Sequence, residues 1–186
     1  MKQILTMDVE KNIENALDFA IKLKNKGIKG EFYITGGITE KYTKEIKIIA
    51  KNHVIGGHGY NHERFEKLTI KEQEEIIKKT IDIFNKNNIK IQGWRFPYLS
   101  FNKDSLKLIR RYNLYDSSIN RRRILGRLYF KKGFHLLPKG LIERPWDYVD
   151  LHDKNILNKS GRLILHDYNY DKKKKIRENE YVKKNI

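Results

Sequence analysis

The chain has 186 residues, of which 39% are hydrophobic, and its formal net charge is +17. Because it contains no cysteine, disulfides and thiolate metal sites are excluded, and any metal must be bound by His, Asp or Glu. No apolar stretch approaches the roughly 20 residues that span a membrane, and residues 1–7 lack the apolar core of a signal peptide. These features predict one folded domain in the cytoplasm.

The high positive charge is compatible with nucleic acid, an anionic membrane surface or a phosphorylated substrate as partner. Most lysines are scattered along expected helices, and only two basic clusters are local, at 121–132 and 172–175. Neither cluster is accompanied by an aromatic-interleaved RNA-binding motif or a helix-turn-helix pattern. Nucleic acid is therefore not an expected partner.

Apolar periodicity predicts strands and helices that alternate along the chain. Strands are expected at 3–7, 30–34, 54–55, 90–95, 114–116, 141–143 and 162–165, and helices at 12–26, 42–51, 70–85, 103–112 and 151–158. Thr69 and Glu72 predict a capping box for the helix at 70–85. Residues 119–139 are expected to be irregular, and the polar tail at 172–186 is expected to fray, which leaves 1–171 as the domain. This alternation predicts an α/β fold with a largely parallel sheet, either open or closed into a barrel.

Five chemically useful side chains lie at or just after the ends of the predicted strands: Asp8, His58, Arg95, Asp116 and His166. In a closed barrel the carboxyl ends of the strands converge on one face, where the loops build the active site. This placement favours a barrel over an open sheet.

The spacing of His58 and His62 predicts that both imidazoles lie on one face of a helical turn and reach a single metal ion. With one carboxylate, from Asp8 or Glu10, they would form a site suited to zinc or a similar divalent ion. The other acid would be the general base that Arg95 holds ionised. His166 would be the general acid, with Asp116 or Asp167 near enough to tune it. Together these residue types indicate metal-assisted hydrolysis.

Each of these residues also has a structural interpretation when it is taken alone. Asp8 is typical of a helix cap and Glu10 of a first helical turn. Arg95 is typical of a charged surface, and His166 of a hydrogen-bonded core residue at the end of an apolar strand. The remaining histidines, His53, His135 and His152, have no comparable context and are predicted to be non-functional.

Five segments, in order, resemble the motifs of polysaccharide deacetylases, the NodB-homology group or carbohydrate esterase family 4. They are Thr-Met-Asp-Val-Glu at 6–10, His-Gly-Tyr-Asn-His at 58–62, Arg-Phe-Pro-Tyr at 95–98, Tyr-Asp-Ser-Ser at 115–118 and Leu-Ile-Leu-His-Asp at 163–167. Residues 32–36 also resemble the family's second strand. The resemblance implies a distorted (β/α) barrel and metal-dependent removal of N-acetyl groups from an amino sugar or glycan.

The resemblance also implies a role for each matching residue. His58 and His62 would bind the metal, Asp8 would be the base held by Arg95, and His166 would protonate the departing amine. The backbone N–H of Tyr98 would stabilise the oxyanion, and Asp116 belongs to a variant of its motif. The usual first motif ends Asp-Asp-Gly, with the second Asp on the metal. Val9 occupies that position here, so Glu10 is the expected third ligand, as in members that carry Asp-Val-Glu.

Two other functions remain open at this point. One is hydrolysis of another non-peptide C–N bond, as in cyclic amides of the allantoin type, and the other is a catalytically decayed carbohydrate-binding domain. For the deacetylase, a cytoplasmic location suggests a phosphate-linked or lipid-linked sugar. The basic segment at 121–132 would attract its phosphates or an anionic membrane.

Overall fold

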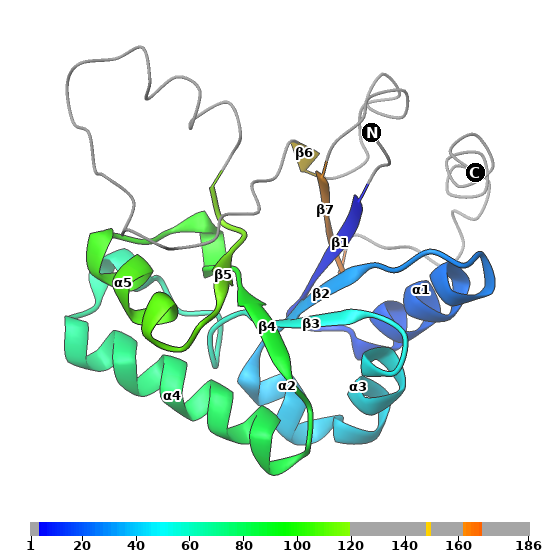
Figure 1. Ribbon diagram of the computed structural model, residues 1–186, viewed down its shortest axis with the longest axis horizontal. Helices are drawn as coiled ribbons and strands as arrows, with labels where there is room; N and C mark the ends of the chain where they lie inside the picture. The colour runs from blue at the N-terminus through cyan, green and yellow to red at the C-terminus, as the bar shows by residue number, and fades with distance from the viewer. Residues whose placement is uncertain (1–3, 120–147, 150–161, 169–186) are drawn as a thin grey trace.

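The computed structural model describes residues 4–119, 148–149 and 162–168. Its strands form one parallel sheet in the order β5-β4-β3-β2-β1-β7-β6 (Figure 1). The strands are β1 (Ile4–Val9), β2 (Glu31–Ile34), β3 (Val54–Gly57), β4 (Ile91–Trp94), β5 (Tyr115–Asp116), β6 (Tyr148–Val149) and β7 (Arg162–His166). Because all pairs are parallel, the carboxyl ends of the strands lie at one edge.

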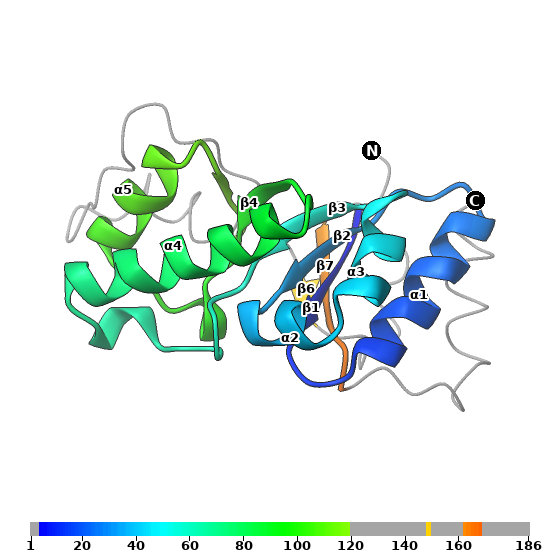
Figure 2. The same cartoon turned by 90° about the horizontal axis from the view of Figure 1, so that it is seen from below.

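The helices lie on the outer side of the curved sheet (Figures 1 and 2). They are α1 (Ile13–Asn25), α2 (Gly36–Lys41), α3 (Thr43–Ala50), α4 (Ile70–Lys86) and α5 (Lys103–Arg111). Short 3₁₀ turns lie at Phe65–Lys67 and Pro97–Leu99. Within the described residues the sheet ends at β5 on one side and β6 on the other, so it is a curved, incomplete barrel. The predicted α/β barrel with parallel strands is confirmed.

Side chains alternate between the two faces of each strand and give those faces different chemistry. Met7 and Val9 of β1 and Phe32 and Ile34 of β2 are fully buried in the hydrophobic core against the helices. Burial of each such side chain contributes about 1.5–3 kcal/mol to folding. Thr6 and Asp8 of β1, which alternate with these residues, lie on the inner face and are also buried. The barrel interior is therefore polar, and the apolar core lies outside it.

Helix caps follow the sequence signals closely. The predicted capping box is present, since the Thr69 hydroxyl accepts a bond from the Glu72 backbone N–H and the Glu72 carboxylate accepts one from the Thr69 N–H. Helix α1 is capped by Asn12, whose side chain accepts from the Asn15 N–H, and not by Asp8. Asp8 is thereby left available for another role.

Two predicted elements differ from the structure, and one observed strand was not predicted. β1 extends to Val9, so that Asp8 lies within the strand. The helix expected at 42–51 is preceded by α2, because bonds from Gly36 N–H to Gly59 O and from Gly37 N–H to Tyr60 O anchor a helical start directly after β2. β6 was not predicted. The strand expected at 141–143, the helix at 151–158, the whole basic segment at 121–132 and the tail at 172–186 lie outside the described residues.

None of the helices in the described part of the chain combines the length and the apolar character needed to span a membrane.

Candidate metal centre and active site

A pocket of about 330 Å³ opens at the carboxyl edge of the sheet. It contains six of the eight predicted site residues: Asp8, Glu10, His58, His62, Tyr98 and His166. Lys11, Leu99, Ile164 and Tyr168 complete its lining. Of the other two predicted site residues, Arg95 lies directly behind Asp8, and Asp116 lies elsewhere.

Three of the pocket residues converge as a candidate metal site. Glu10, His58 and His62 each offer one ligand atom, and these atoms lie within 4.8 Å of one another. Glu10 Oε1 is 3.0 Å from His62 Nε2 and 3.5 Å from His58 Nε2. Both Nε2 atoms are buried, and among the described residues each faces the Glu10 carboxylate without a well-aligned hydrogen bond. Two buried imidazole nitrogens that face one carboxylate oxygen fit a divalent cation, for which all three are ordinary ligands.

The position of His58 leaves the correct nitrogen free for a metal. His58 follows β3, and its Nδ1 lies 2.7 Å from the carbonyl oxygen of Arg95. A carbonyl only accepts, so Nδ1 carries the proton and Nε2 keeps its lone pair toward the pocket. Hydrogen bonds of this kind fix the tautomer and the ring orientation of metal-binding histidines.

The prediction that His58 and His62 share a helical turn is wrong. The residues from His58 to Arg64 form a loop, in which Gly59 and His62 have left-handed backbone angles of φ +73° and +64°. The loop is closed by the Glu63 carboxylate, which accepts bonds from the N–H groups of Tyr60 at 2.9 Å and Asn61 at 2.7 Å. Gly59 and the carboxylate four residues beyond it were the available sequence signals for this loop.

Glu10 is held by a residue whose role the sequence left open. One carboxylate oxygen of Asp167 accepts bonds from three successive backbone N–H groups, those of Glu10 at 3.1 Å, Lys11 at 2.8 Å and Asn12. These groups precede helix α1, where backbone donors have no intrahelical partner. Asp167 is fully buried. It therefore fixes the loop that carries Glu10, instead of tuning His166.

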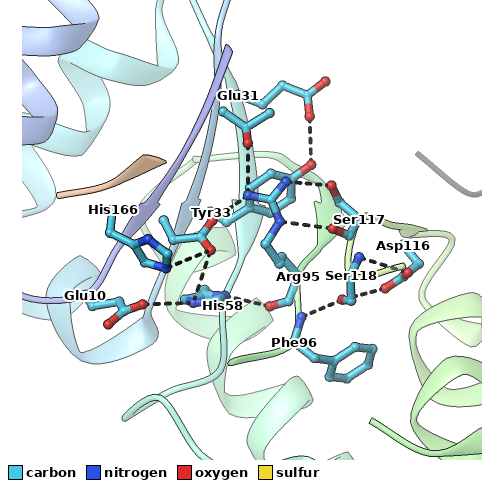
Figure 3. A network of polar contacts seen from close by, with 12 residues as sticks. Glu10, Glu31, Tyr33, His58, Arg95, Phe96, Asp116, Ser117, Ser118 and His166 are labelled. Carbon is cyan, nitrogen blue, oxygen red and sulfur yellow. Dashed lines mark hydrogen bonds and ion pairs between the residues drawn. The ribbon is translucent and has the colours of Figure 1, made fainter. Parts of the chain in front are cut away.

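The predicted base and its cation are in contact. Arg95 Nη1 donates to Asp8 Oδ1, and both side chains are almost completely buried. Asp8 Oδ2 faces the pocket, 3.9 Å from His58 Nε2 and 4.0 Å from His166 Nε2 (Figure 3). His166 is paired directly with Asp8 in the strand register between β1 and β7. One oxygen of Asp8 is thus tied to Arg95, while the other faces the metal ligands and the predicted acid.

Charge interactions set the ionisation of this cluster. Burial by itself raises the pKa of Glu10, whereas the two neighbouring imidazoles, in the forms that carry a proton on Nε2, lower it on balance through polar contact and charge, so Glu10 is then an anion at neutral pH. Burial by itself lowers the pKa of Arg95, but the charge of Asp8 raises it on balance, so the guanidinium stays protonated. The site therefore holds a fixed cation behind the base and an ionised carboxylate among the metal ligands.

Tyr98 lies at the edge of the pocket in a strained backbone. Tyr98 and Leu99 have φ of 55° and 53°, which are uncommon for residues with a Cβ and often found at functional sites. The Tyr98 ring packs against the His62 ring at 4.3 Å and under the Arg64 guanidinium at 4.1 Å. These contacts place the Tyr98 ring beside His62, one of the candidate metal ligands.

Asp116 is not brought to the reacting groups. Its fully buried carboxylate accepts from the N–H and the hydroxyl of Ser118, and the Ser118 hydroxyl accepts from the Phe96 N–H. In Figure 3, Asp116 and His166 lie on opposite sides of Arg95. Asp116 therefore supports the backbone next to Arg95, and these contacts are not with His166, which Asp116 was expected to tune.

His53 agrees with its prediction as a non-functional residue. It is buried, its Nδ1 accepts from the Gly30 N–H at 3.1 Å, and its Nε2 donates to the Ala20 carbonyl at 2.9 Å. It joins α1, β2 and the turn before β3. His135 and His152 lie outside the described residues.

Fold and site together define a parallel α/β barrel with a candidate two-histidine, one-carboxylate metal centre at its carboxyl edge. Comparison with known proteins agrees with this class. Residues 4–116 match the sequence profile of the family described as polysaccharide deacetylase, and the chain belongs to that family.

The relatives show how far the similarity extends. The peptidoglycan-N-acetylglucosamine deacetylase of Bacillus cereus is 35% identical over 83 residues, which are 44% of this chain and 30% of that protein. The chain thus spans about a third of the length of the curated relatives that it matches.

Two solved structures show the fold. A putative polysaccharide deacetylase from Mycobacterium smegmatis is 14% identical with a TM-score of 0.72, and the match covers 98% of this chain and 84% of that one. A carbohydrate esterase family 4 pseudoenzyme from Bacillus anthracis is 17% identical with a TM-score of 0.68, over 98% of this chain and 61% of that one. Because one of these structures is described as a pseudoenzyme, the shared fold does not by itself establish activity.

Proposed function

We propose that this protein is a metal-dependent hydrolase that removes the acetyl group from an N-acetylated amino sugar or glycan. The observation that carries the proposal is the placement of two kinds of groups in one pocket. The Glu10, His58 and His62 cluster lies beside Asp8, whose Oδ2 is 4.0 Å from His166 Nε2 and whose other oxygen is bound by Arg95. Metal-assisted amide hydrolysis uses a metal centre, a base and an acid in such proximity.

Glu10, His58 and His62 would hold the divalent ion, and zinc suits two imidazoles and a carboxylate. When bound, such an ion polarises the amide carbonyl and lowers the pKa of a coordinated water. Three protein ligands leave positions for water and substrate. The identity of the metal is part of the proposal.

Asp8 would take a proton from the attacking water while the water oxygen bonds to the acetyl carbonyl carbon. Arg95, which donates to Asp8 Oδ1, keeps the carboxylate ionised and directs Oδ2 into the pocket. The backbone N–H of Tyr98, at the pocket edge, would donate to the developing oxyanion.

His166 would complete the reaction by donating its proton to the amide nitrogen as the C–N bond breaks. The products are acetate and the free amine of the sugar. His166 Nε2 and Asp8 Oδ2 lie 4.0 Å apart, so the base and the acid are within reach of the same bound amide.

The aromatic and basic side chains at the pocket edge support a sugar as the class of substrate. Tyr98 and Tyr168 are 54% and 47% exposed and offer ring surface against which a sugar packs. The Lys11 ammonium lies 5.1 Å from the centre of the Tyr168 ring and favours a sugar that also carries an anionic group. A phosphate-linked or lipid-linked amino sugar, contact with an anionic membrane and a cytoplasmic location remain predictions.

The alternative of a decayed binding domain is less well supported, although a family pseudoenzyme shares the fold. A binding module has no need of a buried base, a cation that fixes it and an acid, all of which are present and in contact distance. No contact in the described residues favours a cyclic amide over an N-acetyl sugar.

The test is acetate release from N-acetylglucosamine oligomers and from phosphorylated N-acetylglucosamine, with allantoin as a comparison substrate. The protein is stripped with a chelator and reloaded with zinc. We expect acetate release that needs the metal, is lost in Asp8→Asn and His166→Ala, and is retained in Asp18→Asn, a half-buried acid on α1 that pairs with Lys22 outside the pocket. Metal binding without acetate release from any acetylated sugar would refute the proposed function.

A further inference from the structure

A polar cluster lies directly beneath the predicted base, on the inner face of the sheet, and has no part in the chemistry described above. It consists of Glu31 and Tyr33 of β2 and Tyr115 of β5, which are 5%, 0% and 5% exposed. Burial of a carboxylate here requires a specific arrangement, because an uncompensated buried charge is very costly.

In the strand register, glycines lie beside the two tyrosines and leave room for their rings. Tyr33, Gly56, Gly93 and Tyr115 are successive partners in one row across β2, β3, β4 and β5. A Cβ at Gly56 would lie 2.5 Å from the Tyr33 ring, and one at Gly93 would lie 2.3 Å from the Tyr115 ring. The two central strands therefore carry no side chain where the two rings meet.

The hydroxyls of this row converge on one carboxylate oxygen. Tyr33 donates to Glu31 Oε2 at 2.7 Å, Tyr115 donates to the same oxygen at 3.3 Å, and the two hydroxyl oxygens are 3.4 Å apart. Burial, together with the charge of Glu31, raises the pKa of Tyr33 well above its usual range, so its hydroxyl remains a donor. The orientation of the Tyr33 ring is thereby fixed.

The fixed ring supports Arg95. The Arg95 guanidinium carbon lies 4.0 Å above the Tyr33 ring, and the guanidinium donates to Asp8, to the Thr6 hydroxyl and to the hydroxyl and carbonyl of Ser117 (Figure 3). The hydrogen bonds fix the N–H groups at the edge of the Arg95 guanidinium, and the Tyr33 ring fixes the orientation of the guanidinium plane. Because Asp8 and Tyr33 are register partners, the same ring lies next to the base in the sheet.

We infer that Glu31, Tyr33 and Tyr115 are positioning residues that hold the Arg95 guanidinium, and through it Asp8, in the geometry needed for catalysis. None of the three lines the pocket, so none contacts substrate or metal directly. This inference rests on the proposed function only for its kinetic readout, since the immobility of Arg95 is measurable in the absence of any reaction.

The experiment compares Tyr33→Phe, which keeps the ring and deletes the hydroxyl, and Glu31→Gln with the matched controls Tyr42→Phe and Glu75→Gln on exposed positions of the helical side. In zinc-loaded protein we expect both test variants to lower kcat between about 10-fold and 100-fold, a loss typical of small misplacements of catalytic groups. KM and zinc affinity should stay within about twofold of the wild-type values, and the controls should be unchanged.

A second readout uses ¹⁵N-arginine NMR, with the Arg95 signals assigned from Arg95→Lys. In the wild type, the terminal N–H groups of Arg95 should be separately resolved and protected from exchange, and both test variants should lose this restriction. Unchanged Arg95 signals in both variants would refute the inference, whether or not the wild type releases acetate. Loss of kcat together with loss of zinc affinity and of cooperative unfolding would also refute it, because that combination indicates a general structural role.

Discussion

Replacement of Asp167 by Asn tests whether Asp167 holds the loop that carries Glu10, because it leaves the Glu10 side chain itself unchanged. One Asp167 oxygen accepts three backbone N–H groups from the loop that carries Glu10. Hydrogen bonds to a charged acceptor contribute about 1.5–3 kcal/mol each and are not additive. Asn keeps the shape and one acceptor oxygen but loses the charge that complements the start of α1. We expect Asp167→Asn to lower the free energy of unfolding by about 2–3 kcal/mol.

Metal affinity should also fall, although Asp167 is not a ligand. Removal of groups that orient metal ligands typically weakens binding about 10-fold to 100-fold. Zinc affinity is measured by competition with a chromophoric chelator, and stability by urea unfolding of the metal-free protein. Asp18→Asn on α1 is the matched control; it removes one i,i+4 ion pair with Lys22, so it should leave zinc affinity unchanged and lower the free energy of unfolding by no more than about 0.5 kcal/mol. Wild-type zinc affinity in a folded Asp167→Asn protein would show that the loop holds Glu10 without this anchor, and the reasoning would be wrong.

Three further predictions concern the scaffold. Burial and, to a smaller extent, Lys29 lower the pKa of His53 from 6.5, although its bond to Ala20 raises it, so the unfolded chain binds this proton more tightly. The stability that depends on neutral His53 is complete above about pH 6.5 and is lost as the pH falls through the folded-state pKa. Urea unfolding between pH 7 and pH 5 should therefore show a smaller loss of stability in His53→Gln than in the wild type. Gly93→Ala should lower the free energy of unfolding by about 1–3 kcal/mol through its clash with the Tyr115 ring, whereas a wild-type Cm would mean that the ring moves freely aside. Thr69→Ala should cost about 1 kcal/mol by removing the cap of α4, as measured by thermal unfolding.

Much of the fold follows from local sequence signals. The strand and helix alternation, the capping box at Thr69 and the convergence of strand ends all correspond to the structure. These features depend on side-chain periodicity and on short-range hydrogen bonds, which one sequence displays directly. The positions of side chains at the ends of the strands were therefore enough to predict that most of the candidate site residues lie in one pocket.

What the sequence left open depends on contacts between distant segments. The hydrogen bond from the Glu10 N–H to Asp167 joins residues more than 150 positions apart, and no local sequence pattern at either residue predicts it. The row of Tyr33, Gly56, Gly93 and Tyr115 exists only once four strands are in register. The backbone conformation from His58 to His62 could not be predicted, because the same spacing of histidines also suits a helix. It depends on the Glu63 carboxylate, which closes the loop.

The Asp-Val-Glu order of the first motif has a direct geometric explanation. Asp8 and Val9 are adjacent in β1, so they point to opposite faces, and Val9 is fully buried in the core against the helices. A second acid at position 9 would need a change of backbone direction to reach the pocket. Glu10 is two residues from Asp8, the spacing that returns a side chain to the same face, and Asp167 holds its backbone there. Its longer side chain then brings Oε1 to 3.0 Å from His62 Nε2. Val9 is therefore a core residue, and Glu10 supplies the carboxylate that lies beside the two histidines of the proposed metal site.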